Sequence, residues 1–171
     1  MSVRIHIEDG PHEGISRGEI ARRARAMMGC LQLNEAELSI VLTGDSQIQE
    51  LNRVYRRKDR PTDVLAFAMR EGDFARVAGG LLGDVIVSVP TARKQALLRK
   101  RLVLEEVTML LAHGLLHLLG WDHDTAAKDK RMRAETERLC EAARPSRPPV
   151  SGNAAAPKTP RRRQRKQGDR V

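Results

Sequence analysis

Apolar and polar positions along the first 143 residues follow strand and helix periods in turn. Four segments alternate apolar and polar residues or hold a short unbroken apolar run, and these predict strands: 3–7, 38–42, 64–68 and 82–89. Five segments repeat apolar residues at helical spacing, and these predict helices: about 16–30, from 45 or 46 to 54, 90–99, 102–119 and 125–142. Two strand–helix pairs, then two strands, then three helices indicate an α+β or mixed α/β domain.

Local signals add detail to this pattern. Ser16 is expected to cap the first helix, with Glu19 as its capping-box partner. Asp45 or Ser46 is expected to cap the second helix in the same way. The unbroken apolar run at 64–68 predicts a strand in the middle of the sheet, because central strands are buried on both faces.

The net charge of +9 is concentrated at the C-terminal end of the chain. Segment 144–171 holds nine basic residues, one acidic residue and five of the eight prolines, whereas residues 1–143 carry a net charge of only +1. Such a composition cannot bury enough apolar surface to fold, so it predicts a disordered tail behind a single domain of residues 1–143. The basic run at 161–166 is either a non-specific RNA-binding arm or a solvated, dispensable extension, and the sequence favours neither.

Composition also narrows the class of protein. No stretch of 18 apolar residues is present, which excludes a membrane span, and the N-terminus lacks a secretory signal pattern. Cys30 and Cys140 lie far apart without a CxxC motif, as expected in a reducing compartment. We therefore expect a cytoplasmic protein, and the excess of positive charge points to a polyanionic partner such as nucleic acid.

Three of the five histidines lie within eleven residues, at His113, His117 and His123. Two histidines four residues apart project from one face of a helix, so their nitrogens can bind one metal ion. Gly120 is expected to end the helix and let the chain turn back, so that His123 supplies a third ligand. Three protein ligands leave a fourth position for water, which is typical of a catalytic zinc site, although cobalt, nickel or iron would also bind.

The spacing of the three histidines equals that of the metzincin proteases, HExxHxxGxxH, with one difference. Those proteases place a glutamate after the first histidine as the general base, whereas this chain has Gly114. A peptide hydrolase of that mechanism would therefore lack its proton acceptor.

The residues around the histidines resemble the signature of the YbeY family of bacterial endoribonucleases, HGxLHLxGYDH. The matching segments are HGLLHLLGWDH at 113–123, a block at 51–67 that includes PTDVL, and LGDV at 82–85. The resemblance covers about residues 1–142. It departs from the family pattern at Trp121, Ala66 and Ala68, and it does not extend to the basic tail.

This resemblance implies a small α+β domain in which a mixed four-stranded sheet packs with about five helices and the histidine helix lies at the centre. It also implies one zinc ion held by His113, His117 and His123, and a functional arginine at Arg56. The implied activity is cleavage of single-stranded RNA, in 3′ end maturation of small-subunit rRNA and in ribosome quality control. The implied partners are therefore rRNA and the small ribosomal subunit.

Phosphodiester chemistry is consistent with these residues. A zinc ion and a guanidinium can share the extra negative charge of the phosphoryl oxygens in the transition state. A side-chain base on the helix is then not obligatory, which suits Gly114, and either water or the RNA 2′-OH could attack. Without the family resemblance, Arg56 would be taken as a solvated member of the basic run 56–58.

Several acidic residues near the matching segments have two open interpretations. Asp63 and Asp84 could hold the imidazole N–H groups or could serve as turn and capping residues. Asp122 could orient a ligand or cap its turn, and Asp124 is expected to cap the last helix. Glu106 lies near the histidine face of its helix, but ion pairing to Arg99 or Arg101 explains it more simply. Tyr55 and Trp121 are expected to pack in the core or its rim rather than to contact RNA bases.

Three functions remain in competition at the level of the sequence. The first is a zinc-dependent endoribonuclease that acts on rRNA. The second is a metal-dependent peptide hydrolase, which Gly114 disfavours. The third is a non-enzymatic ribosome assembly factor whose metal is structural, which an open fourth coordination position disfavours.

Overall fold

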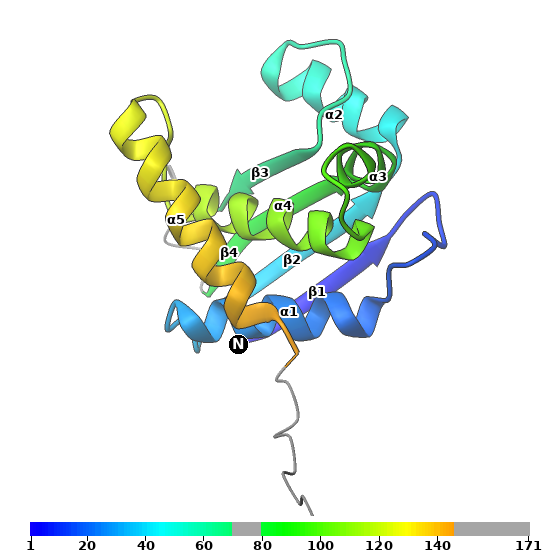
Figure 1. The fold of residues 1–171 in the computed structure, drawn as a ribbon. Helices are drawn as coiled ribbons and strands as arrows, with labels where there is room; N and C mark the ends of the chain where they lie inside the picture. Colours follow the sequence, from blue (N-terminus) through cyan, green and yellow to red (C-terminus); the bar gives the residue numbers. More distant parts are fainter. Residues whose placement is uncertain (70–79, 146–171) are drawn as a thin grey trace, which may run out of the picture.

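The computed structural model describes residues 1–69 and 80–145, and its elements follow the predicted order. They are β1 (Ser2–Ile7), α1 (Arg17–Cys30), β2 (Glu37–Thr43), α2 (Asp45–Arg56), β3 (Val64–Ala68), β4 (Leu81–Ser88), α3 (Val89–Leu98), α4 (Val103–Leu118) and α5 (Ala126–Ala143). The strands form one sheet in the order β1-β2-β4-β3, parallel except for the antiparallel pair β3–β4 (Figure 1). The predicted α+β fold, with a mixed four-stranded sheet and about five helices, is confirmed.

Helices cover both faces of this sheet. α1 and α4 pack on one face, and α5 lies across them (Figure 1). α2 packs on the opposite face, where Ile48 contacts Leu65 and Ile86 in a small separate cluster. α4 lies at the centre and is buried on most sides, because its residues are apolar around nearly the whole circumference.

The predicted central position of strand 64–68 is wrong, because β3 is an edge strand. Its apolar run has another cause. Leu65 and Phe67 face α2, whereas Val64, Ala66 and Ala68 face the main core with α4. A strand at the edge of the sheet is therefore covered on both faces by helices, and sequence cannot distinguish that situation from a central position.

The predicted N-terminal capping residue is observed for α1 but not for α2. The Ser16 hydroxyl accepts a hydrogen bond from the Glu19 N–H, as predicted, but the Glu19 carboxylate bonds to Arg22 and Arg23 and does not complete a capping box. Neither predicted residue caps α2, which begins after Gly44 without a side-chain cap. Asp45 instead accepts hydrogen bonds from the hydroxyls of Ser88 and Thr91 at the start of α3. The Asp45 carboxylate therefore links the start of α2 to the start of α3 and does not cap α2.

Thr125, not Asp124, caps α5, since the Thr125 hydroxyl accepts the Lys128 N–H. Asp124 forms an ion pair with Lys128 at 2.8 Å instead. The predicted tail of 144–171 lies outside the described residues apart from Arg144 and Pro145. Within the part of the chain that is described, no helix is long and apolar enough to cross a membrane.

Candidate metal centre

The last two turns of α4 and the turn that follows bring the three histidines together. His113 and His117 lie on one face of α4, as their spacing predicts. Gly120 has a φ of +81°, a conformation that residues with a Cβ rarely adopt. The N–H groups of Gly120 and Trp121 bond back to the carbonyls of His117 and Leu116, so the chain reverses here. This reversal places His123 beside the other two imidazoles.

The three imidazoles have the geometry of a ligand set. One nitrogen from each ring lies within 4.8 Å of the others. The Nε2 atoms of His113 and His117 are 3.1 Å apart. Two nitrogens bound to one tetrahedral ion at ~2.0–2.1 Å each would lie about 3.3 Å apart, so this separation suits a shared ion. The group could therefore hold a metal ion, with Nε2 as the ligand atom of both helix histidines.

His117 has a hydrogen bond that fixes its ring. The Nδ1–H of His117 donates to the carbonyl of Trp121 at 3.0 Å. This assigns the proton to Nδ1 and leaves the Nε2 lone pair free for a metal. The turn at Gly120 thus has two effects, since it brings in His123 and also orients His117.

Burial and neighbouring imidazoles keep the two helix histidines, His113 and His117, neutral. Burial lowers the pKa of His113 to about 4, and the neighbouring His117 and His123 contribute in the same direction. The pKa of His117 is also lowered, first by burial and then by His123. Neutral imidazole is the form that binds metal, so both rings are ready to do so at neutral pH.

A pocket of about 180 Å³ opens beside the three imidazoles, and Arg56 forms part of its wall. Arg56 is the last residue of α2, and Arg57 ends that helix with a φ of +57°. The positive charge of Arg56 is close enough to contribute to the lowered pKa of His117. Residues far apart in the sequence thus meet at one pocket, although Arg56 remains exposed to solvent.

Gly114 lies where α4 comes closest to the sheet. A Cβ added at Gly114 would stand 2.6 Å from Val85 Cγ1 and 3.2 Å from Val64 Cγ2. Both distances are shorter than ordinary carbon–carbon contacts, so any side chain would push the helix from β3 and β4. The position that holds the general base in the metzincins is therefore closed here by packing.

Comparison with known proteins decides the family. A family model described as endoribonuclease YbeY matches residues 12–144. The chain belongs to the endoribonuclease YbeY family. It is 42% identical over 142 residues to the endoribonuclease YbeY of Anaeromyxobacter sp. strain Fw109-5, covering 83% of this chain and 72% of that one. It is 39% identical over 137 residues to that of Geobacter sulfurreducens, covering 80% and 91%.

A solved structure agrees with the YbeY assignment at the level of the fold. The solution structure of a protein from Thermotoga maritima is 25% identical and superposes with a TM-score of 0.57. The match covers 82% of this chain and 88% of that protein.

The sequence left two interpretations open for Asp63 and Asp84. Of these two aspartates, only Asp63 lines the histidine pocket. It contacts no imidazole directly. One carboxylate oxygen accepts the Val64 N–H at 2.8 Å, and the other accepts the side-chain amide of Gln95 at 3.0 Å. Asp63 therefore caps its own turn at the start of β3, and its negative charge also opposes the fall in the pKa of His113. Asp84 lies within β4 and is not among the residues that line the pocket.

The other residues singled out from the sequence contact the turn before His123 or other parts of the fold. Asp122 accepts the His123 N–H at 2.7 Å, which stabilises the turn that carries the third histidine. The guanidinium of Arg131 lies over the Trp121 ring, 5.8 Å from its centroid. Tyr55 lies edge-on to Phe67 but is 65% exposed, so it lies outside the core, contrary to the expectation from sequence. Sequence reasoning missed the contact of Gln95, because nothing in the local sequence of α3 indicates a bond to Asp63 across 32 residues.

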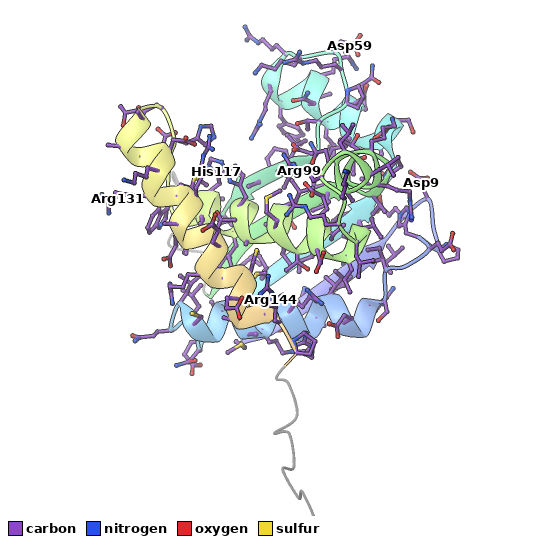
Figure 2. All side chains as sticks on the ribbon, in the orientation of Figure 1. Asp9, Asp59, Arg99, His117, Arg131 and Arg144 are labelled. Carbon is purple, nitrogen blue, oxygen red and sulfur yellow. The ribbon has the colours of Figure 1, made fainter. Side chains whose placement is uncertain are left out.

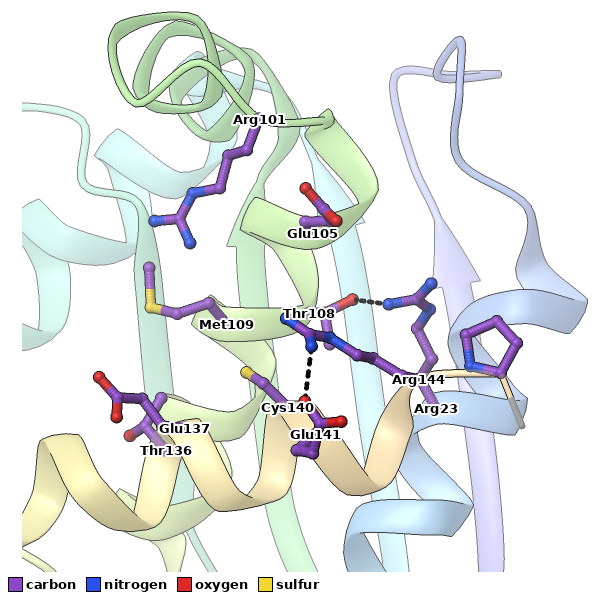
Figure 3. A pocket seen from close by; sticks show the side chains of 11 residues that line it. Arg23, Arg101, Glu105, Thr108, Met109, Thr136, Glu137, Cys140, Glu141 and Arg144 are labelled. Atoms are coloured by element: carbon purple, nitrogen blue, oxygen red, sulfur yellow. Dashed lines mark hydrogen bonds and ion pairs between the residues drawn. The ribbon is translucent and has the colours of Figure 1, made fainter. Parts of the chain in front are cut away.

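A second hollow, of about 670 Å³, is larger than the histidine pocket but lies elsewhere, between α1, α4 and α5 (Figure 3). Its lining includes Arg23, which donates to the Thr108 hydroxyl at 3.0 Å (Figure 3). Arg23 also donates to the Glu19 carboxylate at 2.9 Å. The bond to Thr108 ties α1 to α4, the bond to Glu19 lies within α1, and together they give the nearly buried guanidinium of Arg23 a structural role. Size alone would select this hollow, but the convergence of three imidazoles selects the smaller pocket.

Proposed function

We propose that this chain is a zinc-dependent endoribonuclease that cleaves single-stranded RNA. By its family, its role is in rRNA processing in the cytoplasm, with 3′ end maturation of small-subunit rRNA and ribosome quality control as the specific tasks. The observation that carries the proposal is the meeting of three imidazoles and Arg56 at one pocket in a chain of the endoribonuclease YbeY family.

Each residue of the pocket has a separate task in this proposal. His113, His117 and His123 hold the zinc ion, and the Trp121 carbonyl keeps His117 in the binding tautomer. A bound zinc ion supplies Lewis-acid polarisation and lowers the pKa of water to ~7. Arg56 donates hydrogen bonds to the phosphate oxygens, where negative charge grows during the reaction.

The reaction itself is an exchange of P–O bonds. The oxygen of water or of the RNA 2′-OH bonds to phosphorus as the bond to the leaving oxygen breaks. The attacking oxygen loses a proton and the leaving oxygen gains one. The absence of a side chain at Gly114 supports this reaction over peptide hydrolysis, because packing leaves no room for the glutamate that a metzincin-type protease needs.

Replacement of Arg56 by Ala is expected to reduce RNA cleavage by about 10²–10³-fold at saturating RNA, since a charge-stabilising donor is removed. Metal content should not change, because Arg56 is not a ligand. Single-turnover cleavage of a single-stranded rRNA precursor measures the effect, and casein digestion under the same conditions tests the peptide-hydrolase alternative. Equal losses in Arg56→Ala and Lys58→Ala, an exposed cation of the same run, would show that only general charge matters.

For the basic tail, we propose a role in non-specific RNA affinity. Removal of residues 146–171 keeps Arg144 and its ion pair to Glu141, so the fold and the metal content should be unaffected. RNA affinity should fall, and its dependence on salt should become shallower by ~0.7 in log–log slope for each phosphate group that the shortened chain no longer neutralises. Filter binding over a salt series measures both quantities. An unchanged slope would mean that the tail is a dispensable extension.

A further inference from the structure

The corner between α3 and α4 exposes three large apolar side chains, which we call the leucine corner: Leu97, Leu98 and Leu102. Their exposed fractions are 80%, 83% and 70%. A single exposed leucine is ordinary in a soluble protein, but three within six residues form a patch. Hydration of this apolar surface is unfavourable, so a partner that covered it would gain free energy of association.

The leucine corner is held rigidly. Glu106 in α4 is fully buried, and both Arg99 and Arg101 pair with its carboxylate, the latter at 2.6 Å. Backbone bonds from the N–H groups of Arg99 and Arg101 to the carbonyls of Gln95 and Ala96 close the turn. A buried carboxylate with two cations fixes the backbone on either side of Lys100. The leucines are therefore displayed on a preformed surface, which lowers the entropy cost of binding.

An apolar hollow adjoins the leucine corner. It has a volume of about 560 Å³, and Val89, Pro90 and Leu97 form its apolar wall. Arg93 and Lys94 stand at its edge. Leu97 belongs to both features, so the corner and the hollow are one continuous surface that could accept apolar side chains of a partner.

The surface around the leucines is positively charged. Residues 89–105 contain five basic side chains, Arg93, Lys94, Arg99, Lys100 and Arg101, and one acidic side chain, Glu105, whose carboxylate accepts the Leu102 N–H at 3.2 Å. Asp45 pairs with Lys94, and Glu106 with both arginines that flank Lys100, so an excess of positive charge remains. A complementary partner would carry negative charge around apolar side chains.

We propose that the leucine corner docks an acidic segment of another protein, whose apolar side chains enter the adjoining hollow. Three exposed leucines without an aromatic ring are a poor platform for RNA bases, which stack on aromatic side chains. A symmetric contact between two copies would bring like charges together. The partner is therefore expected to be a different, acidic protein.

This surface is separate from the histidine pocket. Leu102 precedes the first residue of α4, and the metal-binding histidines lie in its last turns, about 16–22 Å away along the helix at 1.5 Å per residue. Figure 2 shows Arg99 beside α3, apart from His117 on α4. Variants at the corner should therefore leave RNA cleavage unchanged, so the docking proposal and the proposed function can fail independently.

A defined peptide tests the proposal with the full-length protein. The probe is a monomeric, helix-forming peptide of about 12 residues with leucines on one face and glutamates on the other, and its counterpart carries lysines in place of the glutamates. Fluorescence anisotropy should give a Kd of the order of 10–100 μM for the acidic peptide and no binding of the basic one. The triple variant L97S/L98S/L102S should bind at least about tenfold more weakly, and Lys100→Glu about threefold more weakly. Val54→Ser, which removes an exposed apolar side chain elsewhere, should bind as the wild type does.

The alternative occupants give different results. Equal binding of both peptides, or no binding of the acidic peptide at 1 mM, would overturn the proposal. Three other losses would also overturn it, if the triple variant shows them and the wild type does not. These are loss of rRNA binding, loss of self-association in light scattering, and loss of binding to anionic phosphatidylserine vesicles. Metal content and RNA cleavage of the triple variant serve as the check that its fold is intact.

Discussion

The His117→Ala variant is expected to lose its metal ion and at least about 10³-fold of its RNA-cleaving activity. His117 supplies one of only three converging imidazoles, and two remaining ligands cannot hold the ion against dilution. The loss should appear as an absence of metal after dialysis, measured by elemental analysis. It should also appear as an absence of the rise in Tm that bound metal gives, which for an ion at 100 times its Kd corresponds to about 2.7 kcal/mol.

The matched control for this variant is His6→Ala. His6 is exposed on β1 and is not part of the histidine group, so this variant should keep both metal and activity. The metal-free forms of both variants should unfold at similar temperatures to the metal-free wild type. RNA cleavage that persisted undiminished in His117→Ala would contradict the proposed function and would point to a contaminating nuclease.

The Gly114→Ala variant is expected to lower the free energy of unfolding by about 1–3 kcal/mol, because the new methyl group overlaps Val85. In an ordinary helix position the same substitution stabilises, since alanine has the higher helix propensity by about 1 kcal/mol. A decrease in the free energy of unfolding at Gly114 would show that α4 lies too close to β4 for a side chain to fit between them. Gly114→Glu, which restores the metzincin sequence, should be more severe and yield little folded protein.

Gly29→Ala is the control that separates packing from propensity. Gly29 lies near the end of α1, and an added Cβ there would meet only the Met1 side chain at 3.9 Å. This variant should therefore be as stable as the wild type or slightly more stable. Urea denaturation of both variants, with equal m-values, measures the difference. A Gly114→Ala variant as stable as Gly29→Ala would mean that the helix moves away from the sheet at no cost.

Periodicity was sufficient for most of the fold, because strand and helix periods arise from local backbone geometry. It gave the order of all nine described elements and the shared face of His113 and His117. Gly120 could also be recognised, since few other residues adopt its φ of +81°. The same reasoning misplaced the strand at 64–68, because apolar faces look alike whether neighbouring strands or helices cover them.

The sequence alone determined that three histidines could converge, because a helical turn and one glycine are local properties. Only the tertiary structure decided which distant residues join them. Arg56 reaches the pocket because α2 ends beside it, and Gly114 is closed by side chains of β3 and β4. Asp45 likewise stabilises α3 rather than its own helix. Such contacts depend on how the helices pack on the sheet, and no local sequence pattern encodes that arrangement.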